Sequence, residues 1–267
     1  MDTAKLKETA DFVLHGFNQL IWPATCDNCG EPVAETQSRL PKSVAGGRVG
    51  SSRLCKKCWD ELLSCTAGDY CPSCGRDASK YALLQGGCPN CHGEQIYFDG
   101  IARAGVYFGA LRKMILAFKI KDRIELDRHL CFLADSALQG AHFYDDIEFF
   151  VPVPLHWARR LTRGYNQSLL LAKNLNHSPA KVNTDLVRIR YTKAQLSLTP
   201  AKRAANVAGA FAVRRGHKFS ARHVCLVDDI KTTGATLNEC AKILKQAGAK
   251  KVYALVLAVA GQSNKTV

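Results

Sequence analysis

The pattern of hydrophobic positions after residue 100 changes repeatedly between short apolar runs and helical spacing. Apolar runs are typical of strands buried in a sheet, whereas apolar residues three and four positions apart indicate helices. The predicted strands are residues 101–108, 147–151, 224–227 and 251–260. The predicted helices are residues 111–118, 126–138 and 235–246. This alternating order predicts an α/β fold with a parallel sheet and helices on both faces.

The start of the chain carries a separate pattern. Apolar residues between positions 4 and 21 fall on one stripe, which predicts an amphipathic N-terminal helix over residues 1–22. Packing is its expected role, and attachment to a membrane surface is the alternative, although the stretch has few cations. No apolar run approaches the roughly 20 residues of a membrane span, and no secretory leader is evident. We therefore expect a cytoplasmic protein without membrane insertion.

Cysteines are concentrated before the predicted sheet. Eight of the 12 cysteines form Cys-x-x-Cys pairs, and two such pairs supply the four thiolates of a structural zinc site. The paired cysteines are Cys26, Cys29, Cys55, Cys58, Cys71, Cys74, Cys88 and Cys91. The spacing predicts two structural Zn²⁺ sites in a double zinc-ribbon module over residues 23–96. An interleaved pairing is one alternative, and disulfides are another, which a reducing compartment disfavours.

Charge is distributed unevenly along the chain. Residues 1–99 contain 10 Lys and Arg against 12 Asp and Glu, whereas residues 100–267 contain 27 against 11. Residues 156–223 alone contain 14 basic residues and one acid, Asp185. This basic segment predicts a surface that attracts polyanions. The zinc module is by charge alone a poor nucleic-acid binder, so it either binds a partner in another way or docks on the basic half of the chain.

Residues 224–236, VCLVDDIKTTGAT, combine a buried strand, two acids and a hydroxyl-rich turn that opens a helix. The backbone N–H groups of such a turn, together with the helix dipole, form an anion site. The predicted phosphate ligands are Thr232, Thr233, Gly234, Ala235 and Thr236. Asp228 and Asp229 are placed to accept hydrogen bonds from vicinal sugar hydroxyls. The alternative is a helix cap, which needs only one of these residues.

This stretch resembles the signature of type I phosphoribosyltransferases that binds 5-phosphoribosyl 1-diphosphate (PRPP), although Lys231 stands where an apolar residue is more common. The resemblance implies a phosphoribosyltransferase-like domain over residues 97–267. In it the two acids hold the ribose, the turn holds the 5-phosphate, and Mg²⁺ accompanies PRPP. A pyrophosphate loop is implied after the strand at residues 147–151. The residues expected in that loop are Pro154, Leu155, His156, Arg159 and Arg163.

Further motifs narrow the resemblance to the ComF/GntX family of competence-associated, phosphoribosyltransferase-like proteins. They are the cysteine pairs, RGYNQ at residues 163–167, RxTxxQxxL at 190–198 and RxxNxxGAF at 203–211. The resemblance covers almost the whole chain, with Tyr165 standing where Phe is common, and implies a bacterial protein tied to the uptake of transforming DNA. It also implies that residues 188–211 form a flexible loop that closes over the ligand. The contacts expected from this loop are Arg190, Thr192, Gln195 and Arg203.

Three functions agree with these features. The first is a PRPP-binding competence protein whose basic segment grips single-stranded DNA. The predicted DNA contacts are Arg159, Arg160, Arg163, Lys202 and Arg203. The second is an active Mg²⁺-dependent phosphoribosyltransferase with an unidentified acceptor, because no nucleobase pocket is recognisable. The third is a noncatalytic adaptor for a competence helicase that translocates DNA or for another uptake protein, which the intact acids and turn argue against.

Overall fold

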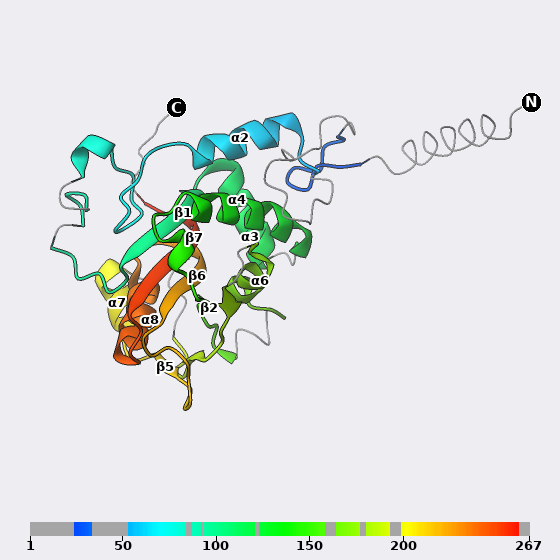
Figure 1. Cartoon of the computed structure of the whole chain (residues 1–267). Coiled ribbons are helices and arrows are strands. Elements are labelled where there is room, and N and C mark those ends of the chain that lie inside the picture. The colour runs from blue at the N-terminus through cyan, green and yellow to red at the C-terminus, as the bar shows by residue number, and fades with distance from the viewer. Residues whose placement is uncertain are drawn as a thin grey trace, which may run out of the picture. The chain divides into compact units, whose positions relative to one another are not determined.

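The computed structural model describes residues 24–33, 53–83, 87–91, 93–120, 123–157, 164–176, 180–192 and 199–261 (Figure 1). The helix predicted over residues 1–22 lies outside these ranges. The chain divides into two compact units, Met1–Leu62 and Leu63–Val267, and each is described by itself. The predicted domain boundary between residues 96 and 97 stays a prediction.

The first unit contains the first two cysteine pairs. A tight knuckle forms around the first pair, because the Cys26 N–H donates to the Glu31 carbonyl over 2.7 Å and the Gly30 N–H donates to the Cys26 carbonyl over 2.9 Å. Gly30 has a φ of +81°, which glycine adopts without strain. Helix α2, Lys56–Thr66, begins directly after Cys55.

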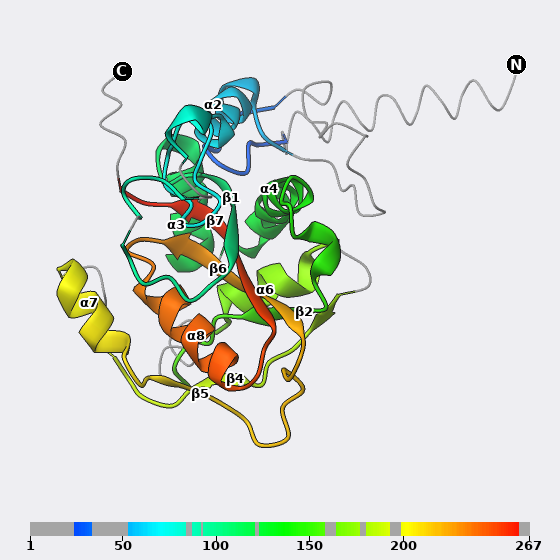
Figure 2. The same cartoon turned by 60° about the vertical axis from the view of Figure 1, so that its left-hand side comes forward.

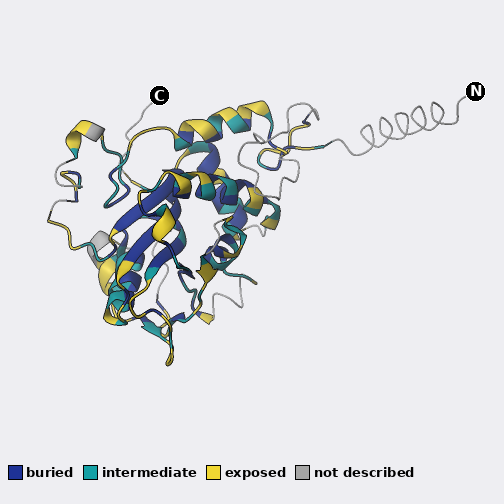
Figure 3. Cartoon of the chain, in the orientation of Figure 1, coloured by how far each residue is buried: buried dark blue, intermediate teal, exposed yellow. Residues whose placement is uncertain are grey.

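The second unit is built on a five-stranded parallel sheet. Its strands lie in the order β1-β7-β6-β2-β3, and every neighbouring pair is parallel. The strands are β1 Gly100–Val106, β2 Phe149–Pro152, β3 Lys181–Val182, β6 His223–Lys231 and β7 Lys251–Val259. The interior strands are buried along most of their length (Figure 3), as expected for a parallel sheet that is covered on both sides.

Helices cover both faces of this sheet (Figure 2). Helices α4, Asp127–Gln139, and α6, Gln167–Asn174, contact one face, and α3, Gly109–Ile120, packs beside α4. Helix α8, Ala235–Gln246, contacts β6 and β7 from the opposite face. Short 3-10 helices span Lys80–Ala82, Ile124–Leu126 and Tyr144–Asp146.

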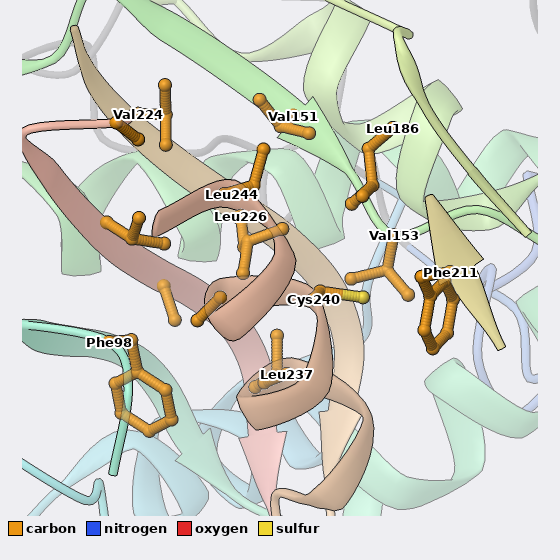
Figure 4. Packing of buried hydrophobic residues seen from close by; sticks show 14 of the residues in the cluster. Phe98, Val151, Val153, Leu186, Phe211, Val224, Leu226, Leu237, Cys240 and Leu244 are labelled. Atoms are coloured by element: carbon orange, nitrogen blue, oxygen red, sulfur yellow. The ribbon is translucent and has the colours of Figure 1, made fainter. Parts of the chain in front are cut away.

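A hydrophobic cluster fills the space between the sheet and α8 (Figure 4). Alternate residues of β7, including Ala254 and Val256, point to this side and meet Leu237, Cys240 and Leu244 of α8. The strand period along β7 and the helical period along α8 therefore each bring an apolar face to this space. Because α8 is held through its apolar face, the turn that precedes it is fixed at the edge of the sheet.

A small antiparallel sheet lies against α8. Strand β4, Leu186–Arg188, pairs with β5, Phe211–Val213. Helix α7, Pro200–Val207, stands in the connection between them, and both α7 and β5 contact α8. Pro200 occupies the first turn of α7, where proline costs no hydrogen bond.

The predicted fold class, a parallel sheet with helices on both faces preceded by a cysteine-rich module, is confirmed. The helix predicted at residues 235–246 has the bounds of α8. Strand β6 continues to Lys231, beyond the end of the strand predicted at residues 224–227, because it stays paired with β7 up to the partners Lys231 and Val259. In the part of the chain that the structure describes, no helix combines the length and the apolar character of a membrane span.

Candidate functional site

Two groups of four cysteines have the geometry of closed metal sites. The groups are Cys26, Cys29, Cys55 and Cys58, and Cys71, Cys74, Cys88 and Cys91. All four Sγ atoms of each group lie within 4.8 Å of one another. The Sγ atoms of Cys29 and Cys55 are 3.7 Å apart and those of Cys74 and Cys88 are 3.6 Å apart, close to the edge of about 3.8 Å of a tetrahedron with Zn–S bonds of about 2.3 Å. Both tetrads can therefore hold structural zinc, and the cysteine pairs combine consecutively.

The second tetrad is packed on the sheet of its own unit. The Ile101 N–H of β1 donates to the Pro72 carbonyl over 2.8 Å. The buried guanidinium of Arg103 donates to the Gly75 carbonyl over 2.9 Å and pairs with Asp77. Because a buried guanidinium is stable only when it is paired, these contacts fix the knuckle. The second tetrad is therefore part of the architecture around the sheet.

The turn between β6 and α8 has the form of an anion site. Gly234 adopts a φ of +83°, and α8 begins there without a side-chain cap. The Ala235 N–H lies 3.4 Å from the Thr233 hydroxyl oxygen. The backbone donors at the positive end of the helix dipole can bind a phosphate. The predicted phosphate ligands at residues 232–236 are thus gathered at one turn.

Two carboxylates stand just before this turn on β6. Asp229 is buried, and its Oδ2 lies 2.6 Å from the Lys119 Nζ of α3. Asp228 Oδ1 accepts hydrogen bonds from the Ser168 hydroxyl at 3.0 Å and from the Asp229 N–H at 2.9 Å. Burial, and then the neighbouring Asp229 carboxylate, raise the pKa of Asp228 to about 7. This pair can accept hydrogen bonds from a diol while holding limited negative charge.

Residues 164–168, from Gly164 to Ser168, contact Asp228 and the end of α3, which carries the lysine partner of Asp229. The Tyr165 hydroxyl donates to the Phe118 carbonyl, and the Gln167 amide lies 3.4 Å from the Lys119 carbonyl. The Asn166 side chain donates to the Val153 carbonyl at 3.1 Å and accepts from the Ser168 N–H at 3.1 Å, which caps α6. The motif therefore positions the Ser168 hydroxyl and the end of α3.

The predicted pyrophosphate loop begins where β2 ends. Strands β2 and β6 are parallel neighbours, so residues 154–156 and the two acids lie at the same carboxyl edge of the sheet. Pro154 and Leu155 are half-buried. His156 is buried, and the centroid of its ring lies 5.2 Å from that of Tyr191 in an edge-on contact. Arg159, Arg160 and Arg163 lie outside the described residues.

The described residues of the segment predicted to close over the ligand make contacts within that segment. The Arg190 guanidinium donates to the Asn206 carbonyl at 3.1 Å and to the Ala208 carbonyl at 2.6 Å. Thr192 is buried and accepts a hydrogen bond from Arg188. Gln195 lies outside the described residues. The structure thus shows Arg190 bracing the end of α7, and its role in ligand binding stays a prediction.

A cavity of about 740 Å³ opens beside the turn. It extends from the second cysteine tetrad to α7 and α8 within the second unit. Its lining includes Cys74, Arg76, Glu94, Arg203, Lys231 and residues 232–235. Arg203 is therefore brought to the phosphate turn, whereas Lys202 is exposed and does not line this cavity.

Sequence reasoning alone does not single out Lys119 or Ser168. Lys119 is one of several cations on α3, and its pairing with Asp229 joins residues far apart in the sequence. Ser168 directly follows the RGYNQ motif, and this position is the sequence feature that could have marked it as a site residue.

Comparison with known proteins identifies the family. No family model matches the chain. Competence protein F of Haemophilus influenzae is 32% identical over 216 residues, which cover 79% of this chain and 92% of that protein. The chain belongs to the ComF/GntX family. Two further members of this family are similar to it. DNA utilization protein YhgH of Escherichia coli is 29% identical and covers 80% of this chain, and competence protein ComFC of Bacillus subtilis is 26% identical and covers 73%.

Similar solved structures were also found for this ComF/GntX member. A purine phosphoribosyltransferase from Pyrococcus horikoshii is 14% identical with a TM-score of 0.30, covering 52% of this chain and 84% of that one. Glutamine PRPP amidotransferase from Bacillus subtilis is 17% identical with a TM-score of 0.32. The match covers 48% of this chain and only 26% of that larger protein.

Proposed function

We propose that this protein binds PRPP and acts in natural transformation by handling incoming single-stranded DNA. The observation that carries the proposal is the arrangement of the two acids, Asp228 and Asp229, directly before the uncapped turn at residues 232–235. An acidic pair followed by a phosphate turn matches the vicinal hydroxyls and the 5-phosphate of one ribose. The relatives named for competence and for DNA utilization support the biological setting.

Within this proposal the two acids have different tasks. Asp228 accepts a hydrogen bond from a ribose hydroxyl, and the ionised form of its carboxylate is favoured when that hydrogen bond forms. Asp229 is held by Lys119 at 2.6 Å, which fixes its carboxylate and limits the charge repulsion between the pair. The 5-phosphate binds the N–H groups of the turn, and the strand end at residues 154–156 faces the pyrophosphate.

The proposed function involves two kinds of metal ion, Zn²⁺ at the cysteine tetrads and Mg²⁺ with PRPP. Zinc at the tetrads is structural, because four thiolates leave no coordination position for a reacting water. Burial raises the pKa of the Cys74 thiol above its ordinary range, so four thiolates can coexist there only with a bound cation. Mg²⁺ would accompany PRPP and would neutralise charge on its phosphates, as is common for magnesium at phosphates.

Single-stranded DNA is proposed to bind along the basic segment. Trp157 and Tyr191 are exposed at 67% and 57% and both pack against the His156 ring. Exposed aromatic faces beside cations are what bases and phosphates of a single strand require. The cytoplasmic location and the helicase partner stay predictions.

Fluorescence anisotropy with a labelled oligothymidylate tests the DNA part of the proposal. Trp157→Ala and Tyr191→Ala are expected to weaken binding by about fivefold or more, because each stacked base contributes about 1–3 kcal/mol. Tyr81→Ala is the matched control, because Tyr81 is 99% exposed and lies outside the basic segment. Affinity should also fall steeply with salt. Equal losses in all three variants, or salt-independent binding, would contradict the proposed surface.

Phosphoribosyl transfer to an acceptor is the second candidate function. The cavity of about 740 Å³ favours it, because it offers space for a further molecule next to the phosphate turn. Release of pyrophosphate from PRPP in the presence of candidate acceptors measures this activity. Pyrophosphate release that is lost in Asp228→Asn would support phosphoribosyl transfer. Binding of PRPP without pyrophosphate release would leave PRPP binding as the function.

A further inference from the structure

Lys231 is a buried lysine whose ammonium has no hydrogen-bond or ion-pair partner among the described residues. It is the last residue of β6 and is only 4% exposed. Its backbone is satisfied, because it pairs with Val259 in the sheet and its carbonyl accepts from the Ala260 N–H at 2.8 Å. Two other buried charged side chains of the second unit that the structure describes form ion pairs, Arg103 with Asp77 and Asp229 with Lys119.

Lys231 lines a cavity, and its ammonium is not among the fully buried polar atoms that lack a partner, so it is accessible from that cavity. A cation of a largely buried residue that makes no ion pair favours the binding of an anion there. Burial, and then the positive charge of Arg76, lower the pKa of Lys231. Arg76 itself donates to the Glu94 carboxylate at 2.8 Å and to the Asn90 carbonyl at 2.6 Å. The Glu94 carboxylate in this cavity lining is therefore already paired with Arg76 and makes no ion pair with Lys231.

The Lys231 side chain runs along the phosphate turn. A Cβ atom added to Gly234 would lie 2.9 Å from the Lys231 Cε and 3.4 Å from its Nζ. The ammonium is thus within a few ångströms of the glycine that begins α8, and Lys231 lines the same cavity as the turn. Gly234 is required here for two reasons, its positive φ and the passage of this side chain.

We propose that Lys231 is a phosphate-binding residue that adds a positive charge to the N–H groups of the turn. The inference rests on the proposed function, because it takes the phosphate bound there to be the 5-phosphate of a ribose phosphate. A turn of neutral donors binds a phosphate through dipoles, whereas an adjacent ammonium adds a charge-assisted contact. Lys231 therefore adds to the turn a charged contact that the backbone N–H groups alone cannot make.

Another role for Lys231 is to offset the negative charge of a zinc-loaded second tetrad. Cys74 lines the same cavity, so its thiolate charge acts on the ammonium. The two roles differ in their effect on stability. A residue that offsets the tetrad stabilises the free protein and its zinc, whereas a residue kept for a phosphate destabilises the free protein and acts only when the ligand is bound.

The test compares Lys231→Met with the wild-type zinc-loaded chain. Calorimetric titration with ribose 5-phosphate should show about tenfold or greater loss of affinity, the loss expected for one charged hydrogen bond. The thermal midpoint of the free variant should rise, because an unpaired buried charge is removed. Lys250→Met is the matched control. Lys250 is exposed, so this variant loses one positive charge at a site away from the turn and should leave the affinity for ribose 5-phosphate unchanged. Lys231→Gln provides a second neutral variant if the Met protein does not fold.

Each outcome decides a separate point. Unchanged affinity in Lys231→Met, while Asp228→Asn weakens PRPP binding, overturns the role of Lys231 and leaves the proposed function standing. Loss of zinc and a lower thermal midpoint without loss of affinity assigns Lys231 to the tetrad and also overturns the inference. No binding of PRPP or ribose 5-phosphate by the wild-type protein overturns the proposed function and this inference with it.

Discussion

Replacing Lys119 by Met tests how the two acids of β6 are held. Met keeps most of the apolar length of lysine but removes the ammonium that lies 2.6 Å from the Asp229 Oδ2. The Asp229 side chain is 8% exposed and that of Lys119 is 26% exposed. Breaking a fully buried ion pair costs about 3–5 kcal/mol. Because water screens the lysine partly, we expect Lys119→Met to lower the free energy of unfolding by about 2–3 kcal/mol.

Urea unfolding of the zinc-loaded chain measures this loss in a double-mutant cycle. Asp229→Asn removes the charge that Lys119→Met leaves unpaired, so the double variant should be more stable than Lys119→Met alone. Lys113→Met on the same helix is the control, and as an exposed residue it should change stability by about 0.5 kcal/mol or less. A Lys119→Met protein as stable as this control, or additive effects in the cycle, would refute the reasoning.

Three further predictions concern the metal, the acids and the turn. Cys74→Ser should lose about one of two zinc ions by metal analysis, because three thiolates bind zinc more weakly; retention of both ions would contradict the site. The pKa of Asp228, raised to about 7 in the folded chain, implies that the free energy of unfolding falls as pH rises from about 4 to 7, and Asp228→Asn should flatten this dependence in pH-resolved urea unfolding. Gly234→Ala should lower the thermal midpoint and weaken ribose 5-phosphate binding, because the added Cβ would lie 2.9 Å from the Lys231 Cε at a backbone position with positive φ. An unchanged thermal midpoint and an unchanged affinity would contradict this prediction.

Local patterns predict the elements that frame the site. The period of Leu237, Cys240 and Leu244 defines α8, because these residues face the core in every turn. The apolar residues of β7 are buried on both faces, so they form one continuous run in the sequence. The cysteine spacing likewise predicts the tetrads, because each Cys-x-x-Cys turn is a local structure.

Contacts between distant segments could not be predicted in the same way. Three of residues 228–231 are charged, and the strand predicted from the apolar run ends before them. They stay in the sheet because β7 pairs with this stretch and Lys119 pairs with Asp229. Helix α7 has weak apolar character and forms beside α8. The unpaired state of Lys231 depends on the placement of Arg76 and Glu94, which only the fold reveals.

The central claim is that the acids and the turn bind PRPP. Calorimetric titration of the zinc-loaded chain with PRPP and Mg²⁺, beside the Asp228→Asn/Asp229→Asn variant, tests it most directly. The account predicts saturable binding by the wild-type protein and a loss of about tenfold or more in the variant, because two charged acceptors of the ribose hydroxyls become neutral amides. Equal binding by both proteins, or no binding by the wild-type protein, would contradict it.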